Sequence, residues 1–426
     1  MLFSFAASGV IQDSNVITGI LLARGLGATG RGELAAVLLW PGMLAALFSL
    51  GVTPAATYFA ARNKEQTPTL LWTVVWLGLA QGVLAVLLGV AILPFVLSDF
   101  DPSTVESAYL YLPYIPVSLL ALFLMGVLNG LARHRAFQLL RVAVIVVAAL
   151  LLIALTAFDH LEVRAAALAY LVANILTLFG AVYALRDQWQ RPSRPSRRLL
   201  SEVLAFGLKS HTTSVSTFFN QRLDQLVISL LLAPAQLGIY VVAVTLTAIT
   251  SLVGYSIALV ALPATARAPA VRRALEARTF VGAATATSIL VTVPILIFTP
   301  QIVELFFGPG FAEAATVARI LLVGAVAFST SRVLEAVLQA IGRPLDAGIA
   351  EGAALAFTLI GLLILLPALE LIGAGLASFI AYTASVIFMV RRTTQALNLT
   401  SSELLIADRT TLARLMAEVR TQTGPG

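Results

Sequence analysis

The chain carries little charge and contains no cysteine. Of its 426 residues, 11% are charged and 59% are hydrophobic, and lysine occurs only at Lys64 and Lys209. The absence of cysteine excludes disulfides, a thiol nucleophile and a thiolate metal site. The three histidines, His134, His160 and His211, are too far apart in the sequence for metal-ligand spacing, so we expect no metal site. Abundant arginine and alanine in place of lysine are typical of a high-GC bacterial genome.

Long apolar segments recur along almost the whole chain. Leu70–Leu97, for example, contains no charged residue. A bilayer crossing needs about twenty apolar residues, and a soluble domain cannot bury so many segments of this length. The pattern therefore predicts an all-α polytopic membrane protein with about twelve spans. We expect them near residues 2–22, 34–61, 69–97, 108–131, 137–158, 164–185, 203–232, 236–263, 279–299, 316–340, 347–368 and 371–390.

Basic residues are concentrated in alternate loops, which predicts the orientation in the membrane. One set of loops carries Arg62, Lys64, Arg133, Arg135, Arg186, Arg191, Arg194, Arg197, Arg198, Arg267, Arg272, Arg273, Arg278, Arg343, Arg391 and Arg392. The other set carries only Arg24, Arg31 and Arg164, together with several acidic residues. We therefore expect both termini in the cytoplasm, with the first helix retained and not cleaved as a signal peptide. The same bias explains the net charge of +6 without a nucleic-acid partner.

The longest internal linker predicts how the spans are grouped. Residues 186–202 are polar and proline-broken, and they separate an N-terminal six-helix lobe, 1–185, from a C-terminal six-helix lobe, 203–392. Residues 393–426 form a cytoplasmic tail. Thr400 and Glu403 have the spacing of a capping box, and apolar residues follow at helical spacing. The tail is either an amphipathic helix on the membrane surface or a solvated extension.

The two halves contain related segments. Asn129–Arg133 resembles Gln339–Arg343 at an offset of 210 residues, and Gly30–Gly32 resembles Gly238–Tyr240 at an offset of 208. Nearly constant offsets indicate a duplication. Because each half has an even number of helices, the repeats share one orientation. Repeats of this kind build a substrate cavity along their interface.

The same offset aligns the two most polar membrane segments. Charged residues at membrane depth are costly and usually face a bundle interior or a water-filled cavity. The polar positions of the first predicted helix are Gln12, Asp13, Ser14 and Asn15, and those of the seventh include Lys209, Asn220, Gln221, Arg222, Asp224 and Gln225. For each of three groups of charged residues, a purely structural role stays open beside a role in a site. Arg222 and Asp224 could pair only with each other, and Arg332 and Glu335 could neutralise each other. Arg24 and Arg31 could snorkel to the outer headgroups.

Two stretches resemble a known family. Leu21–Gly27, followed by Gly30–Leu34, resembles the loop after the first helix of bacterial polysaccharide flippases. Arg222–Ile228, followed by Leu237–Tyr240, resembles their seventh helix and the turn after it. The chain is similar to O-antigen or capsule-type flippases of the multidrug/oligosaccharidyl-lipid/polysaccharide (MOP) exporter superfamily. The resemblance implies a MATE-like fold with a V-shaped cavity between two lobes and alternating access.

The resemblance also implies a substrate, namely an oligosaccharide linked to undecaprenyl diphosphate. It would move from the inner to the outer leaflet of the bacterial inner membrane for polysaccharide or O-antigen export. Arg222, Lys209 and Arg332 are candidates for the diphosphate, because phosphate favours arginine and lysine donors. Asp13 and Asp224 are candidates for coupling to H+ or Na+. The candidates for binding sugar hydroxyls are Gln12, Asn15, Asn220, Gln221 and Gln225. We expect membrane lipids and polysaccharide assembly proteins as further partners, and no cofactor.

Other functions stay open on the sequence alone. A MATE-like drug/cation antiporter would favour an acidic cavity, whereas Lys209 and Arg222 are basic. A membrane-embedded glycan polymerase or ligase would need a long outward loop with paired carboxylates, and the outward loops are short, so we expect no enzyme. Lipid II flippases of the same superfamily carry two further helices.

Overall fold

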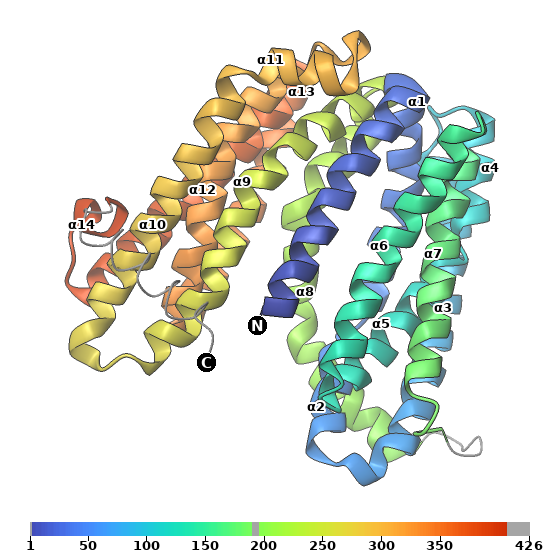
Figure 1. Cartoon of the computed structure of the whole chain (residues 1–426), viewed down its shortest axis with the longest axis horizontal. Coiled ribbons are helices and arrows are strands. Elements are labelled where there is room, and N and C mark those ends of the chain that lie inside the picture. The colour runs from blue at the N-terminus through green and yellow to red at the C-terminus, as the bar shows by residue number, and fades with distance from the viewer. Residues whose placement is uncertain (1, 190–195, 407–426) are drawn as a thin grey trace. The chain divides into compact units, whose positions relative to one another are not determined.

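The computed structural model describes residues 2–189 and 196–406, without the side chains of residues 2–8, 13, 212–214, 216 and 217. Regular structure in these ranges is helical throughout (Figure 1). The chain divides into two compact units, Met1–Val241 and Val242–Gly426. The predicted division at residues 186–202 falls within the first unit, because the helix that follows this linker packs with the N-terminal helices.

Unit 1 contains eight α-helices and one short 3-10 turn within the described residues. They are α1 (Leu2–Phe48), α2 (Val52–Arg62), η1 (Lys64–Gln66), α3 (Thr67–Val96), α4 (Pro102–Tyr111), α5 (Tyr114–Gly130), α6 (His134–Ala157), α7 (Val163–Ala184) and α8 (Arg197–Leu231). Helix α9 (Pro234–Arg267) begins in unit 1 and continues into unit 2.

Unit 2 continues with long helices and a short irregular connection. Its elements are α10 (Ala270–Ile297), α11 (Thr299–Ile302), η2 (Val303–Phe307), η3 (Pro309–Phe311), α12 (Ala314–Ala340), α13 (Pro344–Leu397) and α14 (Ser401–Leu405). The predicted tail is thus described only as far as residue 406, and the apolar positions expected beyond it lie outside the described residues.

The helices account for the predicted spans. Nine helices of the described ranges are long and apolar enough to cross a membrane. Helix α13 contains two predicted spans, which are separated where Glu370 (φ 48°) leaves the helical conformation. Helix α1 contains the first predicted span and most of the second, separated at Gly27 (φ 67°), and the second span continues in α2. The remaining predicted span is α8, which is long enough to cross a membrane but is less apolar than these nine helices because it contains many polar residues. The chain is therefore an all-α, multi-pass membrane protein, as predicted.

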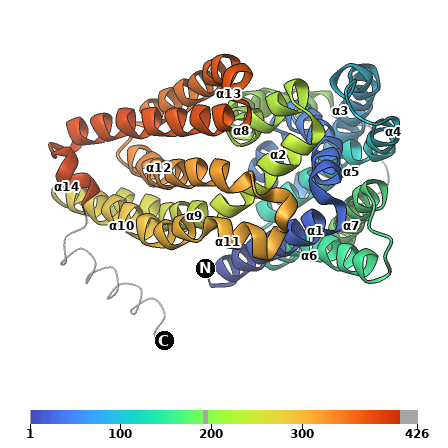
Figure 2. The ribbon, with the colours of Figure 1, turned by 90° about the horizontal axis from the view of Figure 1, so that it is seen from above.

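Unit 1 packs its helices through small residues. Gly126 and Gly130, spaced four apart on α5, face α2 so closely that a Cβ atom at either would lie 2.7 or 2.4 Å from the carbonyl oxygen of Thr53 or Thr57. The Thr57 hydroxyl donates to the Gly126 carbonyl oxygen at 3.0 Å. Such small-residue contacts replace the hydrophobic driving force that is absent between helices in lipid. Helices α6 and α7 also run side by side (Figure 2).

Unit 2 combines an apolar core with hydroxyl pairs between helices. Phe280 of α10, Leu334 of α12 and Met389 of α13 belong to one buried cluster. Hydroxyl groups link α10 to its neighbours, with Ser288 2.6 Å from Ser329 of α12 and Thr292 2.8 Å from Thr250 of α9. Thr400 and Glu403 form the capping box expected from their spacing, and it starts α14.

Two turns that the repeat offset aligns have the same backbone conformation. Ala132 and Gly342, 210 residues apart, both adopt positive φ at the end of a helix. In both turns the arginine that follows donates its N–H to a leucine carbonyl, from Arg133 to Leu128 at 2.9 Å and from Arg343 to Leu338 at 2.8 Å. The two turns therefore share one hydrogen-bond pattern as well as related sequences.

Glycines from the two matching motifs also lie close together within unit 1. A Cβ atom on Gly32 would lie 1.7 Å from the Pro234 carbonyl oxygen, and one on Gly238 would lie 2.0 Å from that of Ala28. Only glycine fits at either position. The Gly30–Gly32 segment of α1 therefore packs directly against the start of α9 at Gly238, although the offset of 208 aligns Gly238 with Gly30 and not with Gly32.

Candidate functional site

Helix α8 carries the polar residues that the sequence singled out. Arg222 is exposed within the described structure, and its Nη1 donates to the Gln225 side-chain oxygen at 3.0 Å. Asp224 lies two residues further on, where the helix turns it towards the interior, and its side chain is 8% exposed. The two charged residues therefore point in different directions from one helix.

Asp224 is held by neutral partners. The buried Tyr240 of α9 donates its hydroxyl to one Asp224 carboxylate oxygen at 2.6 Å, and the Gln225 backbone N–H donates to the other at 2.7 Å. Among the described residues, no ion pair joins Asp224 to Arg222. Asp224 interacts with Arg222 electrostatically, and its direct hydrogen-bond partner from another helix is Tyr240 of α9.

Arg31 is the second cationic residue near this part of α8. Snorkelling of Arg31 to the outer headgroups, which the sequence left open, stays a prediction. Its side chain is half-buried and interacts electrostatically with Tyr170 of α7 and with Arg222. Its Nε atom is buried and has no hydrogen-bond partner among the described residues. Arg222 therefore interacts electrostatically with a second cation, Arg31, as well as with the carboxylate of Asp224. A further anion would stabilise two neighbouring positive charges.

Three tyrosines form a chain of contacts from one arginine to the other. Tyr111 and Tyr114 stack with ring centroids 4.8 Å apart, Tyr114 interacts electrostatically with Arg222, and Tyr111 does so with Tyr170. We call these five residues the arginine–tyrosine cluster: Arg31, Tyr111, Tyr114, Tyr170 and Arg222. Five helices of unit 1 contribute to it. The sequence indicated only Arg222, because single tyrosines in apolar helices give no recognisable pattern.

The other candidates lie on α1 and α8. Gln12 is half-buried and Asn15 is exposed on α1, whereas the side chain of Asp13 lies outside the described residues. On α8, Asn220 is half-buried, Gln221 is exposed and Gln225 is buried. Lys209, near the start of α8, is exposed and lines a separate cavity at the linker end of unit 1, the end at which α7 stops and α8 begins.

Arg332 belongs to unit 2 and is occupied by carboxylates. Its Nη1 lies 2.9 Å from Glu335, and its Nη2 pairs with Glu351 of α13. The Arg332 side chain is 11% exposed, and its guanidinium lies 5.0 Å from the centre of the Phe328 ring. The neutralisation expected for Arg332 and Glu335 is therefore present, and Glu351 adds a second negative charge.

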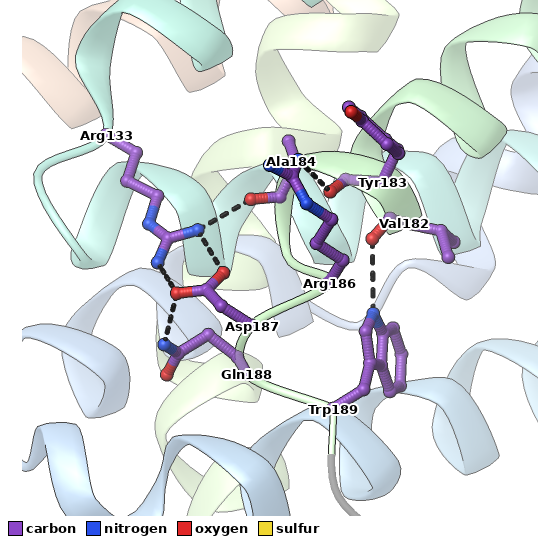
Figure 3. Close-up of polar contacts among 8 residues, drawn as sticks. All are labelled: Arg133, Val182, Tyr183, Ala184, Arg186, Asp187, Gln188 and Trp189. Carbon is purple, nitrogen blue, oxygen red and sulfur yellow. Dashed lines mark hydrogen bonds and ion pairs between the residues drawn. The ribbon is translucent and has the colours of Figure 1, made fainter.

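A further polar group at the linker end was not indicated by the sequence. Arg133 donates to the Ala184 carbonyl oxygen at 2.6 Å and to Asp187 at 2.7 Å, and it pairs with the second Asp187 oxygen (Figure 3). Hydrogen bonds from Arg133, and then from Gln188, hold the pKa of Asp187 well below its usual range. The Trp189 indole N–H donates to the Val182 carbonyl oxygen at 3.2 Å. These contacts fix the segment after α7 against the end of the bundle.

Comparisons with known proteins identify the class of protein. By structure the whole chain is similar to a lipid II flippase, MurJ, in an inward closed conformation, with a TM-score of 0.75, 15% identity and coverage of 100% of this chain and 94% of MurJ. It is also similar to an inward-facing multidrug resistance MATE transporter of the MOP superfamily, with a TM-score of 0.69, 20% identity and coverage of 90% and 94%. The fold is therefore the MOP-type fold of these structures, in agreement with the predicted fold class.

The family follows from the sequence comparison. Residues 3–269 match the family described as polysaccharide biosynthesis protein, and the chain belongs to this family. A probable low-salt glycan biosynthesis flippase, Agl15 of Haloferax volcanii, is 23% identical over 231 residues, which cover 53% of this chain and 48% of Agl15. The matched stretch thus spans about half the length of that curated relative.

Proposed function

We propose that the chain is a flippase for a lipid-linked oligosaccharide. Its substrate is a glycan carried on undecaprenyl diphosphate, moved from the inner to the outer leaflet of the bacterial inner membrane for polysaccharide or O-antigen export. Membership of the polysaccharide biosynthesis family supports this proposal. So does the similarity to two proteins described as flippases. In this proposal both termini are cytoplasmic, which follows from the distribution of arginine among the loops.

The arginine–tyrosine cluster is the observation that carries the proposal. Arg31 and Arg222 interact electrostatically as two cations, beside the carboxylate of Asp224, which also interacts with Arg222. Arg31 in addition has a buried donor, Nε, without a partner among the described residues. A diphosphate supplies negative charge and several acceptor oxygens, so it matches both features. A cationic drug would be repelled by the same pair of charges, which disfavours the antiporter alternative.

The remaining polar residues take supporting roles in this proposal. Asp224, together with Asp13, binds the coupling ion, H+ or Na+. The amides of Gln12, Asn15, Asn220, Gln221 and Gln225 contact sugar hydroxyls. Lys209 binds the diphosphate in an earlier step. Arg332 stabilises unit 2 through its two carboxylate partners and does not bind substrate. Proteins of polysaccharide assembly receive the product on the outer side.

Transport by reconstituted protein tests the proposal. Proteoliposomes are loaded in parallel with a fluorescent undecaprenyl-diphosphate oligosaccharide and with a fluorescent lipophilic cation. The flippase function predicts that the protein accelerates exposure of the glycan lipid to an external quenching or cleaving reagent and leaves the movement of the cation unchanged. Ion-driven export of the cation, with no effect on the glycan lipid, would support the antiporter and refute the proposal.

A further inference from the structure

A cavity at the linker end of unit 1 combines positive charge with an aromatic wall. It has a volume of about 510 Å³ and is formed by α2, η1 and α8. Its lining residues are Tyr58, Phe59, Arg62, Asn63, Gln66, Arg198, Glu202, Ala205, Phe206 and Lys209. The cavity shares no residue with the arginine–tyrosine cluster.

The charges of this cavity are unbalanced. Glu202 is its single carboxylate, and it pairs with Arg198 at 2.9 Å. Arg62 donates to the Tyr58 hydroxyl at 3.2 Å. Because that hydroxyl is neutral, this contact does not compensate the positive charge of Arg62. Lys209 adds another cation, and its side chain is exposed. Two positive charges in a cavity of this size suit a phosphate or a diphosphate.

The aromatic wall provides flat apolar surface beside these cations. The Tyr58 and Phe206 rings are stacked, with centroids 4.6 Å apart and planes at 16°, and the Phe59 ring meets Phe206 edge-on. The amides of Asn63 and Gln66 lie on the same lining. A flat apolar surface with a few convergent polar groups is typical of a site for an organic ligand. The cavity is therefore suited to an organic phosphate or diphosphate and not only to an inorganic anion.

An entirely apolar groove lies further along α3. It has a volume of about 470 Å³ and is lined by Trp72, Val75, Leu120, Leu124, Leu178, Phe179, Val182 and Trp189. Trp72 and Trp189 meet edge to face, with ring centroids 5.4 Å apart. The hydrogen bonds of Arg133 and Trp189 hold this side of the groove in place (Figure 3). Tryptophans at such a position are typical of the membrane–water interface.

Residues of η1 and α3 line the cavity, a smaller space and the groove in succession along the chain. The smaller space, of about 280 Å³, is lined by Gln66, Thr69, Ser196, Arg198, Leu199 and Glu202, and it shares three of these residues with the cationic cavity. Thr69 lines the smaller space and Trp72 and Val75 line the groove, so the path from Gln66 to Val75 passes from polar to apolar surroundings. At 1.5 Å per residue, this path is roughly 14 Å long.

We propose that the cavity and groove together form a loading site for the lipid-linked glycan. The diphosphate binds Arg62 and Lys209, the first sugar lies against Tyr58 and Phe206, and the first isoprenoid units occupy the Trp72–Trp189 groove. The site lies at the linker end, which is cytoplasmic in the proposed orientation, and would capture the lipid before it reaches the arginine–tyrosine cluster. This inference rests on the proposed function. It commits to an isoprenoid diphosphate, because an ordinary phospholipid head would not use the stacked aromatic wall.

Binding to the purified full-length protein tests this site with three probes: undecaprenyl diphosphate, phosphatidylglycerol and inorganic diphosphate. The double variant Arg62→Gln, Lys209→Gln should weaken binding of undecaprenyl diphosphate and of inorganic diphosphate at least about tenfold, because two charge-assisted contacts are lost. Trp72→Ala should weaken binding of undecaprenyl diphosphate alone. Matched controls are Arg135→Gln, an exposed cation at the same end, and Trp76→Ala, on α3 but outside the groove lining. Both should bind as the unmodified protein does.

Several results would overturn the inference. The first is that the double variant, at an unchanged melting temperature, binds undecaprenyl diphosphate with the affinity of the unmodified protein. The second is that the matched controls lose as much affinity as the cavity and groove variants. The third is that phosphatidylglycerol binds as tightly as undecaprenyl diphosphate and that Trp72→Ala weakens its binding equally. If the unmodified protein flips the glycan lipid while the cavity variants bind it normally, the loading site is wrong and the proposed function stands. If the unmodified protein neither binds nor flips it, the proposed function itself is wrong.

Discussion

The contact between Asp224 and Tyr240 gives a sharp prediction about which interactions stabilise α8. Tyr240→Phe keeps the buried ring and removes only the hydroxyl that donates to Asp224 at 2.6 Å. Hydrogen bonds between membrane helices contribute about 0.6 kcal/mol on average and at most about 1.7 kcal/mol, and a charged acceptor roughly doubles the strength. We therefore expect the free energy of unfolding to fall by about 1–3 kcal/mol.

Arg222→Ala provides the contrast. Arg222 is exposed and contacts Gln225 and not Asp224, so its removal should change the free energy of unfolding by no more than about 0.5 kcal/mol. A double-mutant cycle between Arg222→Ala and Asp224→Ala should then show coupling below about 0.5 kcal/mol. Asp224→Asn is the matched control, since its side-chain oxygen can still accept from Tyr240.

The assay is reversible unfolding in mixed detergent for all five variants, followed by tryptophan fluorescence. The reasoning would be refuted if Arg222→Ala destabilised the protein by about 3 kcal/mol or more and Asp224→Ala then restored stability, because that pattern belongs to a buried ion pair. It would also fail if Tyr240→Phe had no effect.

Three further predictions concern orientation, packing and acid stability. Single cysteines at Ser193 and Ser103, in this cysteine-free chain, should react with an impermeant thiol reagent from opposite sides of the membrane, and labelling from one side would contradict the twelve-span topology. Gly238→Ala should abolish accumulation of folded protein, because its Cβ atom would lie 2.0 Å from the Ala28 carbonyl oxygen, whereas Gly42→Ala, where nothing lies within 4 Å, should accumulate normally; equal yields of the two would contradict the close contact. Since the pKa of Asp187 is lower in the folded chain than in the unfolded one, its pairing with Arg133 stabilises the fold above about pH 4 and is lost only as the pH falls through the lower folded value. In a variant whose single tryptophan is Trp189, the fluorescence should therefore stay constant down to about pH 4, and a transition centred above that pH would contradict the pairing.

The helices were largely predictable because the membrane imposes a simple rule on length and hydropathy. Predicted spans at 137–158 and 164–185 correspond to α6, His134–Ala157, and α7, Val163–Ala184. The rule failed at details set by single residues. It could not show that the second predicted helix is interrupted between Phe48 and Val52.

The candidate site was only partly predictable. Polar residues in an apolar helix are conspicuous, so Arg222, Asp224 and Lys209 were found from the sequence alone. Their partners were not, because Tyr240 and Tyr170 are unremarkable in apolar helices and become informative only through their position. For Arg31 the sequence left snorkelling to the outer headgroups as an open alternative. Its unpartnered Nε atom and its interaction with Arg222 depend on how α1 and α8 pack.

The linker end shows another limit of sequence reasoning. Arg133 and Asp187 are 54 residues apart and belong to loops that were noted only for their charge. The groove between Trp72 and Trp189 combines residues from α3, α5, α7 and the segment after α7. No periodicity within a single helix predicts such a surface, because it exists only once the helices are in contact.

The most direct test of the account is the rate at which reconstituted protein flips a fluorescent undecaprenyl-diphosphate oligosaccharide, measured for the unmodified chain and for Arg222→Lys, Arg222→Gln and Arg31→Gln. If the arginine–tyrosine cluster binds the diphosphate, both glutamine variants should lose at least about tenfold in rate at an unchanged melting temperature, and Arg222→Lys should keep part of it, because the charge remains while the bidentate geometry is lost. Flipping at the unmodified rate by both folded glutamine variants would contradict the account.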